Sequence, residues 1–423
     1  EHRFDLGTRT LISLIFQISR ALATGVGLYA VSIVFSVTVG MNIWVTILIV
    51  GIVAMVYDTL GGIKAVVFTD VVQMGILMVG ILVCSGYALY YAGGWSEAMA
   101  EIPAQRWQSI DFRGHGFGDG KDFGFWPLLL GGFFLYVSYY GCDQSQVQRE
   151  LSARNEDDLK KSLFFNGIFR FPVVLGYCFM GLLIGSLLLK DPAFAALVPE
   201  SRPDYLVPMF IVHYLPHGII GVLAVAIFAA AMSSLDSALN SLSAVTYKDI
   251  YQRYFPTQHS PQQALKISKA LTIFWGLFCT GFAFAVGSIS GTVIEAINKI
   301  GSAFYGPILA TFLLGILTRT AAASGVKWGV LLGVGTNLTL WLAFPQVSWL
   351  WWNVIGFAIT FGLGYGISSL LPGRPSGIEP SHEALTLSGG LPESLSKKNW
   401  KPAYIFLGCY FVAIVMLTYW IGS

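Results

Sequence analysis

The chain has 423 residues, of which 55% are hydrophobic and 11% are charged, and its formal net charge is +2. A soluble domain carries roughly 25% charged residues. This composition therefore excludes a soluble globular protein and indicates an integral membrane protein whose main partner is the lipid bilayer. The small net charge, with no basic patch, argues against a nucleic-acid partner. The five cysteines lie in or near apolar segments, which favours buried small hydrophobes over a disulfide framework.

Apolar segments that approach or exceed the ~20 residues needed to cross a bilayer follow one another along the whole chain. In order they are 10–36, 43–60, 64–91, 125–142, 163–189, 217–247, 267–288, 291–317, 324–343, 348–371 and 402–421. The fourth is short and rich in glycine, and residues 204–215 fit a separate helix at the membrane interface. We expect an all-α polytopic protein with about 11 transmembrane helices.

The basic residues predict the orientation of these segments. If the amino end is cytoplasmic, 17 of the 25 lysines and arginines fall inside, 5 fall outside and 3 lie within segments. Cytoplasmic loops carry the excess of positive charge in membrane proteins. We therefore expect the amino end of the chain to be cytoplasmic and the carboxyl end to be outside, in the plasma (inner) membrane.

Polar stretches divide the chain into three parts. Residues 1–371 form the transmembrane core, 372–401 are rich in Pro, Ser, Gly and Glu and fit a cytoplasmic linker, and 402–423 form a last transmembrane helix. The chain opens on a charged stretch without Met, directly before a long apolar segment. We interpret it as a fragment whose beginning is missing.

A tight turn and a membrane carboxylate follow the second segment. Gly61 and Gly62 separate two apolar segments, and Asp70 lies about two turns into the third. A carboxylate at that depth should face the bundle interior or a water-filled cavity. It fits a cation ligand, and the alternative is a structural pair with Arg20 or Arg170.

Small and hydroxyl-bearing residues share one face of the sixth segment. At helical spacing Ala230, Ser233, Ser234 and Ser237 are neighbours, and Asp236 adds a carboxylate on an adjoining face. Hydroxyl oxygens suit a small hard cation. The alternative is a seam of small residues for helix packing, which membrane bundles favour. The nearby acids favour the cation site.

Three motifs in this order resemble those of the sodium/solute symporter family. They read GGxxAVxxTDxxQ at 61–73, DQxxVQR at 143–149, and MSSLDS at 232–237, followed by DIY at 249–251. The family includes sodium-coupled sugar, sialic acid, proline and monocarboxylate transporters. The resemblance implies two inverted five-helix repeats with sites at the membrane midplane. The first segment here resembles the third core helix of that fold, so the first two core helices are not in this chain.

The resemblance also implies the ligands of the coupling ion. The family's sodium site uses a backbone carbonyl and two hydroxyls, which match Ala230, Ser233 and Ser234. Some members have a second sodium site, whose ligands match Asp70, Ser233, position 236 and Ser237. Position 236 is Asp here rather than a hydroxyl residue, which leaves one or two sodium ions open.

Substrate residues follow from the same resemblance. Tyr139 matches a tyrosine that packs against the substrate, and Asn298 and Arg170 fall near positions that touch sugar. Position 136 is Tyr where sugar transporters can carry Asn. Arg20 corresponds to an arginine that binds the substrate carboxylate in sialic acid transporters; the alternative is a structural partner for an acid. These features favour an organic anion.

The prediction is a sodium-coupled symporter that imports a small organic solute, such as sialic acid or a carboxylate. It is not an enzyme and needs no cofactor, with Na⁺ as the coupling ion. Alternatives are a sodium/sugar symporter, a symporter-like sensor module, and a transporter that has lost sodium coupling. Glu295 and Lys299, four residues apart, are predicted to neutralise each other on one helix.

Overall fold

The computed structural model describes residues 1–60, 63–200, 202–255, 259–287, 292–370, 386 and 398–422, and for residues 60 and 63–70 it describes the backbone alone. The long helices are α1 (Leu6–Val39), α2 (Ile43–Leu60), α3 (Ile63–Tyr91), α5 (Gly132–Cys142), α7 (Glu156–Lys190), α10 (His217–Val245), α12 (Pro261–Val286), α13 (Val293–Leu317), α14 (Ala323–Ala343), α15 (Trp349–Leu370) and α17 (Lys401–Gly422).

Short helical pieces connect them. They are α4 (Trp95–Glu101), η1 (Ala104–Arg106), the π-helical turn η2 (Pro127–Gly131), α6 (Gln144–Glu150), α8 (Pro192–Leu197), η3 (Pro203–Tyr205), α9 (Leu206–Tyr214), the π-helical turn η4 (Thr246–Tyr251) and α11 (Gln252–Tyr254). In the described part of the chain, nine helices are long and apolar enough to cross a membrane, and two apolar stretches, Ile43–Thr59 and Pro127–Cys142, are shorter. Together they match the predicted apolar segments one for one.

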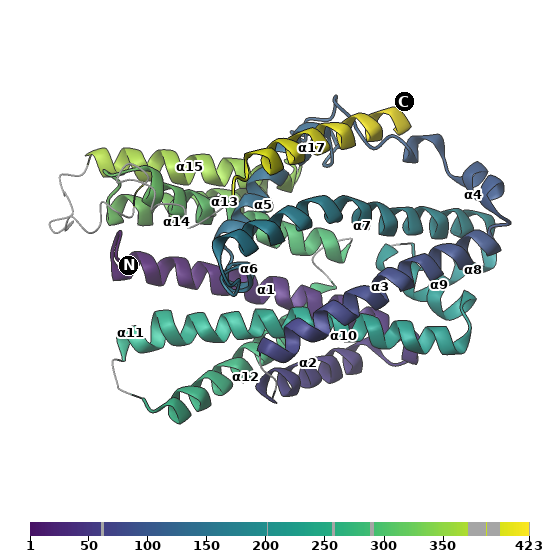
Figure 1. The fold of residues 1–423 in the computed structure, drawn as a ribbon, viewed down its shortest axis with the longest axis horizontal. Coiled ribbons are helices and arrows are strands. Elements are labelled where there is room, and N and C mark those ends of the chain that lie inside the picture. Colours follow the sequence, from purple (N-terminus) through teal and green to yellow (C-terminus); the bar gives the residue numbers. More distant parts are fainter. Residues whose placement is uncertain are drawn as a thin grey trace.

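Helix α1 is the centre of the bundle. It begins after Asp5, whose side chain accepts a hydrogen bond from the Thr8 N–H, and ends at Gly40, whose φ of 73° favours glycine. It packs against α2, α10, α12 and α13, and Figure 1 shows it between the α13–α15 group and α10. Side chains in the middle of α1 therefore lie deep inside the protein.

Glycines let α13, α14 and α15 pack closely. A Cβ added to Gly306 of α13 would lie 2.1 Å from a backbone oxygen of α15. A Cβ on Gly333 of α14 would lie 2.0 Å from the Thr360 hydroxyl of α15. Small residues permit such close backbone approach in membrane bundles. These three helices form a closely packed unit against α1 and α5.

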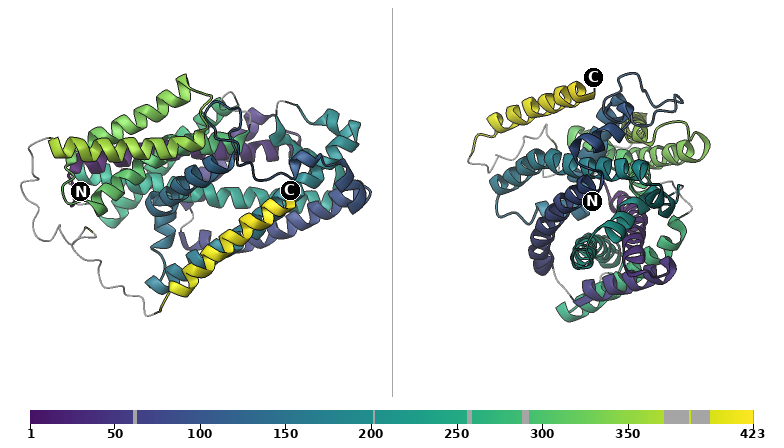
Figure 2. Two further views of the ribbon diagram at one scale, coloured as in Figure 1. Left: turned by 90° about the horizontal axis from the view of Figure 1, so that it is seen from above. Right: turned by 90° about the vertical axis from the view of Figure 1, so that its right-hand side faces the viewer.

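A second apolar cluster joins α3, α4, α7, α8 and α9 at one end of the molecule, around Phe194, Phe210 and Leu183. Helix α17 lies at the edge of the bundle (Figure 2), where it contacts α7 and has no buried residue. Its exposed aromatic and aliphatic side chains, such as Ile405 and Trp420, suit a surface that faces lipid.

Candidate functional site

The predicted cation face lies on α10, in the middle of the bundle. Ser234, Ser237 and Ser241 hydroxyls donate back to carbonyl oxygens one turn earlier, at 3.5, 3.0 and 2.8 Å. Ser233 is buried, with 7% of its surface exposed, and within the described residues its hydroxyl makes no hydrogen bond. Serine hydroxyls in helices commonly bond to the i−4 carbonyl. Ser233 is therefore the serine of this face whose hydroxyl has no such internal partner.

The other predicted ligands of this face differ in availability. Ala230 is half-buried, and within the described residues the one side-chain hydrogen bond to its carbonyl is the long 3.5 Å bond from Ser234, which is itself exposed. Ser237 also accepts a hydrogen bond from the Arg149 guanidinium of α6. A second Na⁺ at Ser237 would face that positive charge. Ser237 is thus the least available of the predicted hydroxyl ligands.

Asp236 takes part in a buried cluster of carboxylates that the sequence reasoning missed. It faces Asp58 of α2, and the two side chains are within hydrogen-bonding reach. They are 3% and 7% exposed. The Asn240 amide nitrogen donates to Asp236 at 3.3 Å and also to Asp58, while the second oxygen of Asp58 is buried without a donor. The sequence contains a signal for this residue, because Asp58 is a carboxylate in the last turn of an apolar segment.

Asp70 lies outside the described side chains, so its predicted role as a cation ligand stays a prediction. Its backbone belongs to α3, and α3 packs along α10.

Arg20 and Tyr139 come together in a buried polar network. The Arg20 guanidinium on α1 lies 3.6 Å from a carboxylate oxygen of Asp143, and Tyr139 of α5 lies close to it. The Tyr305 hydroxyl of α13 donates to the same Asp143 oxygen at 3.3 Å. Arg20 therefore has an acid partner, as the structural alternative predicted. Its Nε is buried without an acceptor, which leaves one donor for a ligand.

Arg170 occupies a different place, between α5 and α7. Its guanidinium donates to the Tyr136 and Tyr140 hydroxyls at 2.9 and 3.0 Å and lies over the Tyr136 ring. These residues line an open, mostly apolar cavity of about 970 Å³ between α5, α7 and α17. Within the described residues, no contact joins Arg170 to Arg20.

Asn298 is separate from both groups. It lies on α13, and its amide nitrogen donates to the Ile294 carbonyl of the same helix at 2.8 Å. On the same helix Lys299 and Glu295 form an ion pair at 2.7 Å, which confirms their predicted mutual neutralisation.

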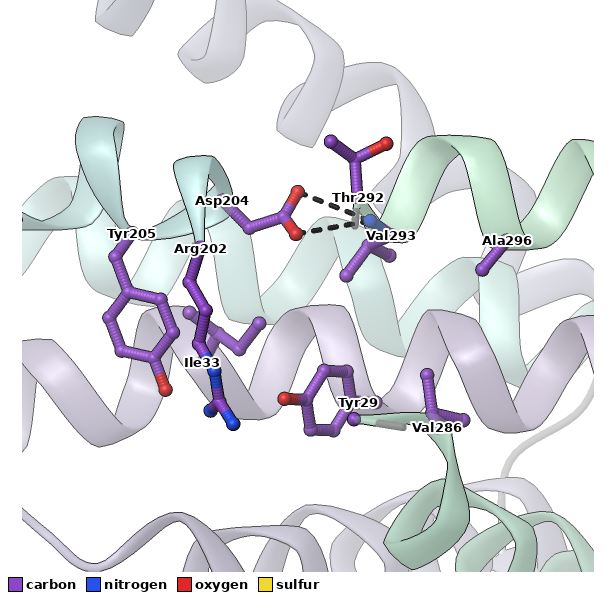
Figure 3. A pocket seen from close by; sticks show the side chains of 10 residues that line it. Tyr29, Ile33, Arg202, Asp204, Tyr205, Val286, Thr292, Val293 and Ala296 are labelled. Atoms are coloured by element: carbon purple, nitrogen blue, oxygen red, sulfur yellow. Dashed lines mark hydrogen bonds between the residues drawn. The ribbon is translucent and has the colours of Figure 1, made fainter. Parts of the chain in front are cut away.

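A polar pocket of about 220 Å³ opens near the carboxyl-terminal end of α1 (Figure 3). Its walls come from α1, the η3 region, the end of α12 and the start of α13. Asp204 accepts hydrogen bonds from the Val293 N–H at 3.1 and 3.3 Å, which holds η3 against the first turn of α13. The Arg202 side chain extends along Ile33 towards Tyr29 (Figure 3).

Comparisons with known proteins decide the family. The model of the sodium:solute symporter family matches residues 1–333. The chain belongs to the sodium:solute symporter family. Its all-helical transporter fold agrees with this assignment, because a Na⁺-coupled sialic acid symporter superposes with a TM-score of 0.73 at 25% identity, covering 87% of this chain and 75% of that one.

Relatives of this chain are sodium-coupled transporters rather than enzymes. Mouse (Mus musculus) sodium-coupled monocarboxylate transporter 2 is 31% identical over 350 residues, covering 81% of this chain and 54% of the relative. The rabbit (Oryctolagus cuniculus) sodium-dependent multivitamin transporter is 30% identical over 412 residues, covering 94% and 60%. The human sodium/iodide cotransporter is 28% identical over 347 residues, covering 81% and 53%. The chain thus spans about half the length of the curated relatives that it matches.

Proposed function

We propose that the complete protein is a sodium-coupled symporter that imports a small organic anion. The observation that carries the proposal is Ser233, a buried residue in the middle of α10 whose hydroxyl makes no hydrogen bond within the described residues. A hydroxyl inside the bundle that has no hydrogen-bond partner is open to a ligand. Na⁺ is a hard cation that takes such oxygens.

Ser233, Ser234 and the Ala230 carbonyl supply three oxygens on one face of α10. The 3.5 Å bond from Ser234 to Ala230 is long, so an ion can replace it at little loss. We propose this set as the first sodium site. Asp70, Asp236 and Ser237 form the proposed second site, in which the two carboxylates would offset the charge of Arg149.

The substrate class follows from charge. Arg20 has a buried donor without an acceptor beside Tyr139, and a guanidinium binds a carboxylate through parallel hydrogen bonds. Three similar proteins are named for monocarboxylates, iodide and sialic acid. We propose that a short carboxylate binds beside Arg20 and Tyr139. Arg170 and Asn298 are then more distant contacts on the path through the protein.

Sodium drives uptake in this proposal. The membrane potential contributes about 2.3 kcal/mol per charge for each 100 mV, added to the sodium concentration gradient. Ion binding at α10 favours the conformation that is open to the outside and helps to order the substrate site. The proposed orientation has the amino end of the chain in the cytoplasm and the carboxyl end outside, in the plasma membrane, with 372–401 as a cytoplasmic linker.

The test is lactate uptake by the full-length protein in proteoliposomes under an inward sodium gradient. We expect Ser233→Ala to raise the sodium concentration for half-maximal uptake on the order of tenfold, since it removes one ligand oxygen. Ser243→Ala is the matched control, because it removes a hydroxyl of the same helix that donates to the Ser268 carbonyl of α12. Equal sodium dependence of the wild type and both variants would reject the site.

A further inference from the structure

The pocket at the far end of α1 contains a cation that no described acid neutralises. Of the basic side chains predicted to lie outside, Lys121 pairs with Asp111 at 2.5 Å and Lys190 pairs with Glu97. Arg202 makes no ion pair within the described residues, and it lines a cavity rather than a flat surface. The Asp204 carboxylate beside it is directed at the α13 backbone instead (Figure 3). The Arg202 donors are therefore available to an acceptor from outside the chain.

The rest of the pocket is suited to a small molecule. Buried apolar groups of Val286, Val293 and Ala296 form part of its wall, with 9% exposure or less. Tyr29 and Tyr205 add aromatic rings with hydroxyl groups. The Asp204 bonds to Val293 fix the η3 turn that carries Arg202. About 220 Å³ accommodates a short carboxylate with its bound water, but not a large ligand.

We propose that this pocket is an outer binding site for the carboxylate group of the transported anion, with Arg202 as the charged contact and the two tyrosines as polar walls. The inference rests on the proposed function and adds a second anion position to it. Tyr29 follows Arg20 by nine residues on α1, a rise of about 14 Å, so one short carboxylate cannot touch both arginines. The outer site raises the local concentration of the anion before it reaches the central site.

Kinetics of lactate uptake by the full-length protein test this site. Arg202→Gln removes the charge and the paired donors, and we expect about a tenfold rise in the apparent KM for lactate with kcat changed less than about twofold. Arg202→Lys keeps the charge without the paired donors and should recover part of the affinity. Arg113→Gln is the matched control. Arg113 is exposed on the loop predicted to lie outside, so this substitution removes the same charge away from the pocket.

Chemical labelling gives a second measurement that does not depend on turnover. A negatively charged thiol reagent should modify Tyr205→Cys, which lines the same pocket and retains Arg202, from outside, and lactate should slow that modification in the absence of sodium. Equal KM values for Arg202→Gln and Arg113→Gln, or labelling that lactate does not slow, would overturn the outer site. Failure of the proposed function has a different signature, because the wild type itself would then show no sodium-dependent lactate uptake.

Discussion

Asp143 offers a direct test of the packing around the centre of the bundle. Its side chain is 1% exposed and lies 3.6 Å from the Arg20 guanidinium, which is 17% exposed. At an effective dielectric constant of about 20, two unit charges at that distance attract by about 4.6 kcal/mol. Removing one partner of a buried pair typically destabilises a protein by about 3–5 kcal/mol, because the other charge stays buried without compensation. We therefore expect Asp143→Asn to lower the free energy of unfolding by about 3–5 kcal/mol.

Asp143 also caps a helix, so a second variant separates the two roles. Its other carboxylate oxygen accepts the Ser145 N–H at 2.9 Å, at the start of α6. Asparagine retains this cap, whereas Asp143→Ala loses it and should destabilise by about 1 kcal/mol more. Asn155→Ala is the control, since Asn155 caps α7 at an exposed position by accepting the Asp158 N–H and should lose only about 1 kcal/mol.

The assay is equilibrium unfolding of the full-length protein in mixed micelles, titrated with a denaturing detergent and followed by tryptophan fluorescence. The expected order of stability is wild type, then Asn155→Ala, then Asp143→Asn, then Asp143→Ala. If Asp143→Asn loses no more than Asn155→Ala, the pair with Arg20 does not stabilise the bundle and the reasoning is wrong.

Three further predictions concern other regions. Gly306→Ala should lower the free energy of unfolding by about 1–3 kcal/mol, because its Cβ would lie 2.1 Å from a backbone oxygen of α15, whereas Gly335→Ala, which has no atom within 4 Å, should be neutral or stabilising in the same titration. Asp58→Asn should raise stability, since it relieves the repulsion between Asp58 and Asp236, and it should lower sodium affinity in uptake assays, since it removes an acid beside Asp236 of the proposed second sodium site; a less stable variant with unchanged affinity would contradict this. Backbone N–H groups of residues 115–121 lower the pKa of Asp119 to about 2 from its usual 3.8. The order that this carboxylate gives the loop should therefore persist below pH 3.8 and be lost as the pH falls through about 2, which pepsin cleavage within 110–124 would detect; a midpoint near 3.8 would show that the N–H bonds are absent.

The membrane-spanning helices were predictable because their composition alone defines them. Hydropathy predicts segments at 217–247 and 348–371, and the structure has α10 at His217–Val245 and α15 at Trp349–Leu370. It began the fifth segment at 163, whereas α7 begins at Glu156 after the Asn155 cap. The first two turns of α7 are polar, so hydropathy did not register them, although the capping residue and its acids signal a helix start.

The site was predictable only where one helix carries it. Spacing on α10 placed Ser233 and Asp236 correctly on neighbouring faces, because helical geometry is local. The partner of Arg20 was not predictable, since Asp143 is 123 positions away and no local pattern links α1 to the start of α6. Asp58 was predictable as a functional carboxylate, because it lies in an apolar segment as Asp70 does. Its position next to Asp236 was not predictable, because that position depends on how α2 packs against α10.

The most direct test of the central claim is equilibrium binding of radioactive ²²Na⁺ to the purified full-length protein, in the absence of substrate. We expect saturable binding that Ser233→Ala and Ser234→Ala both weaken on the order of tenfold, while Ser243→Ala leaves it unchanged. Binding of equal strength in the wild type and all three variants would contradict a sodium site on this face of α10.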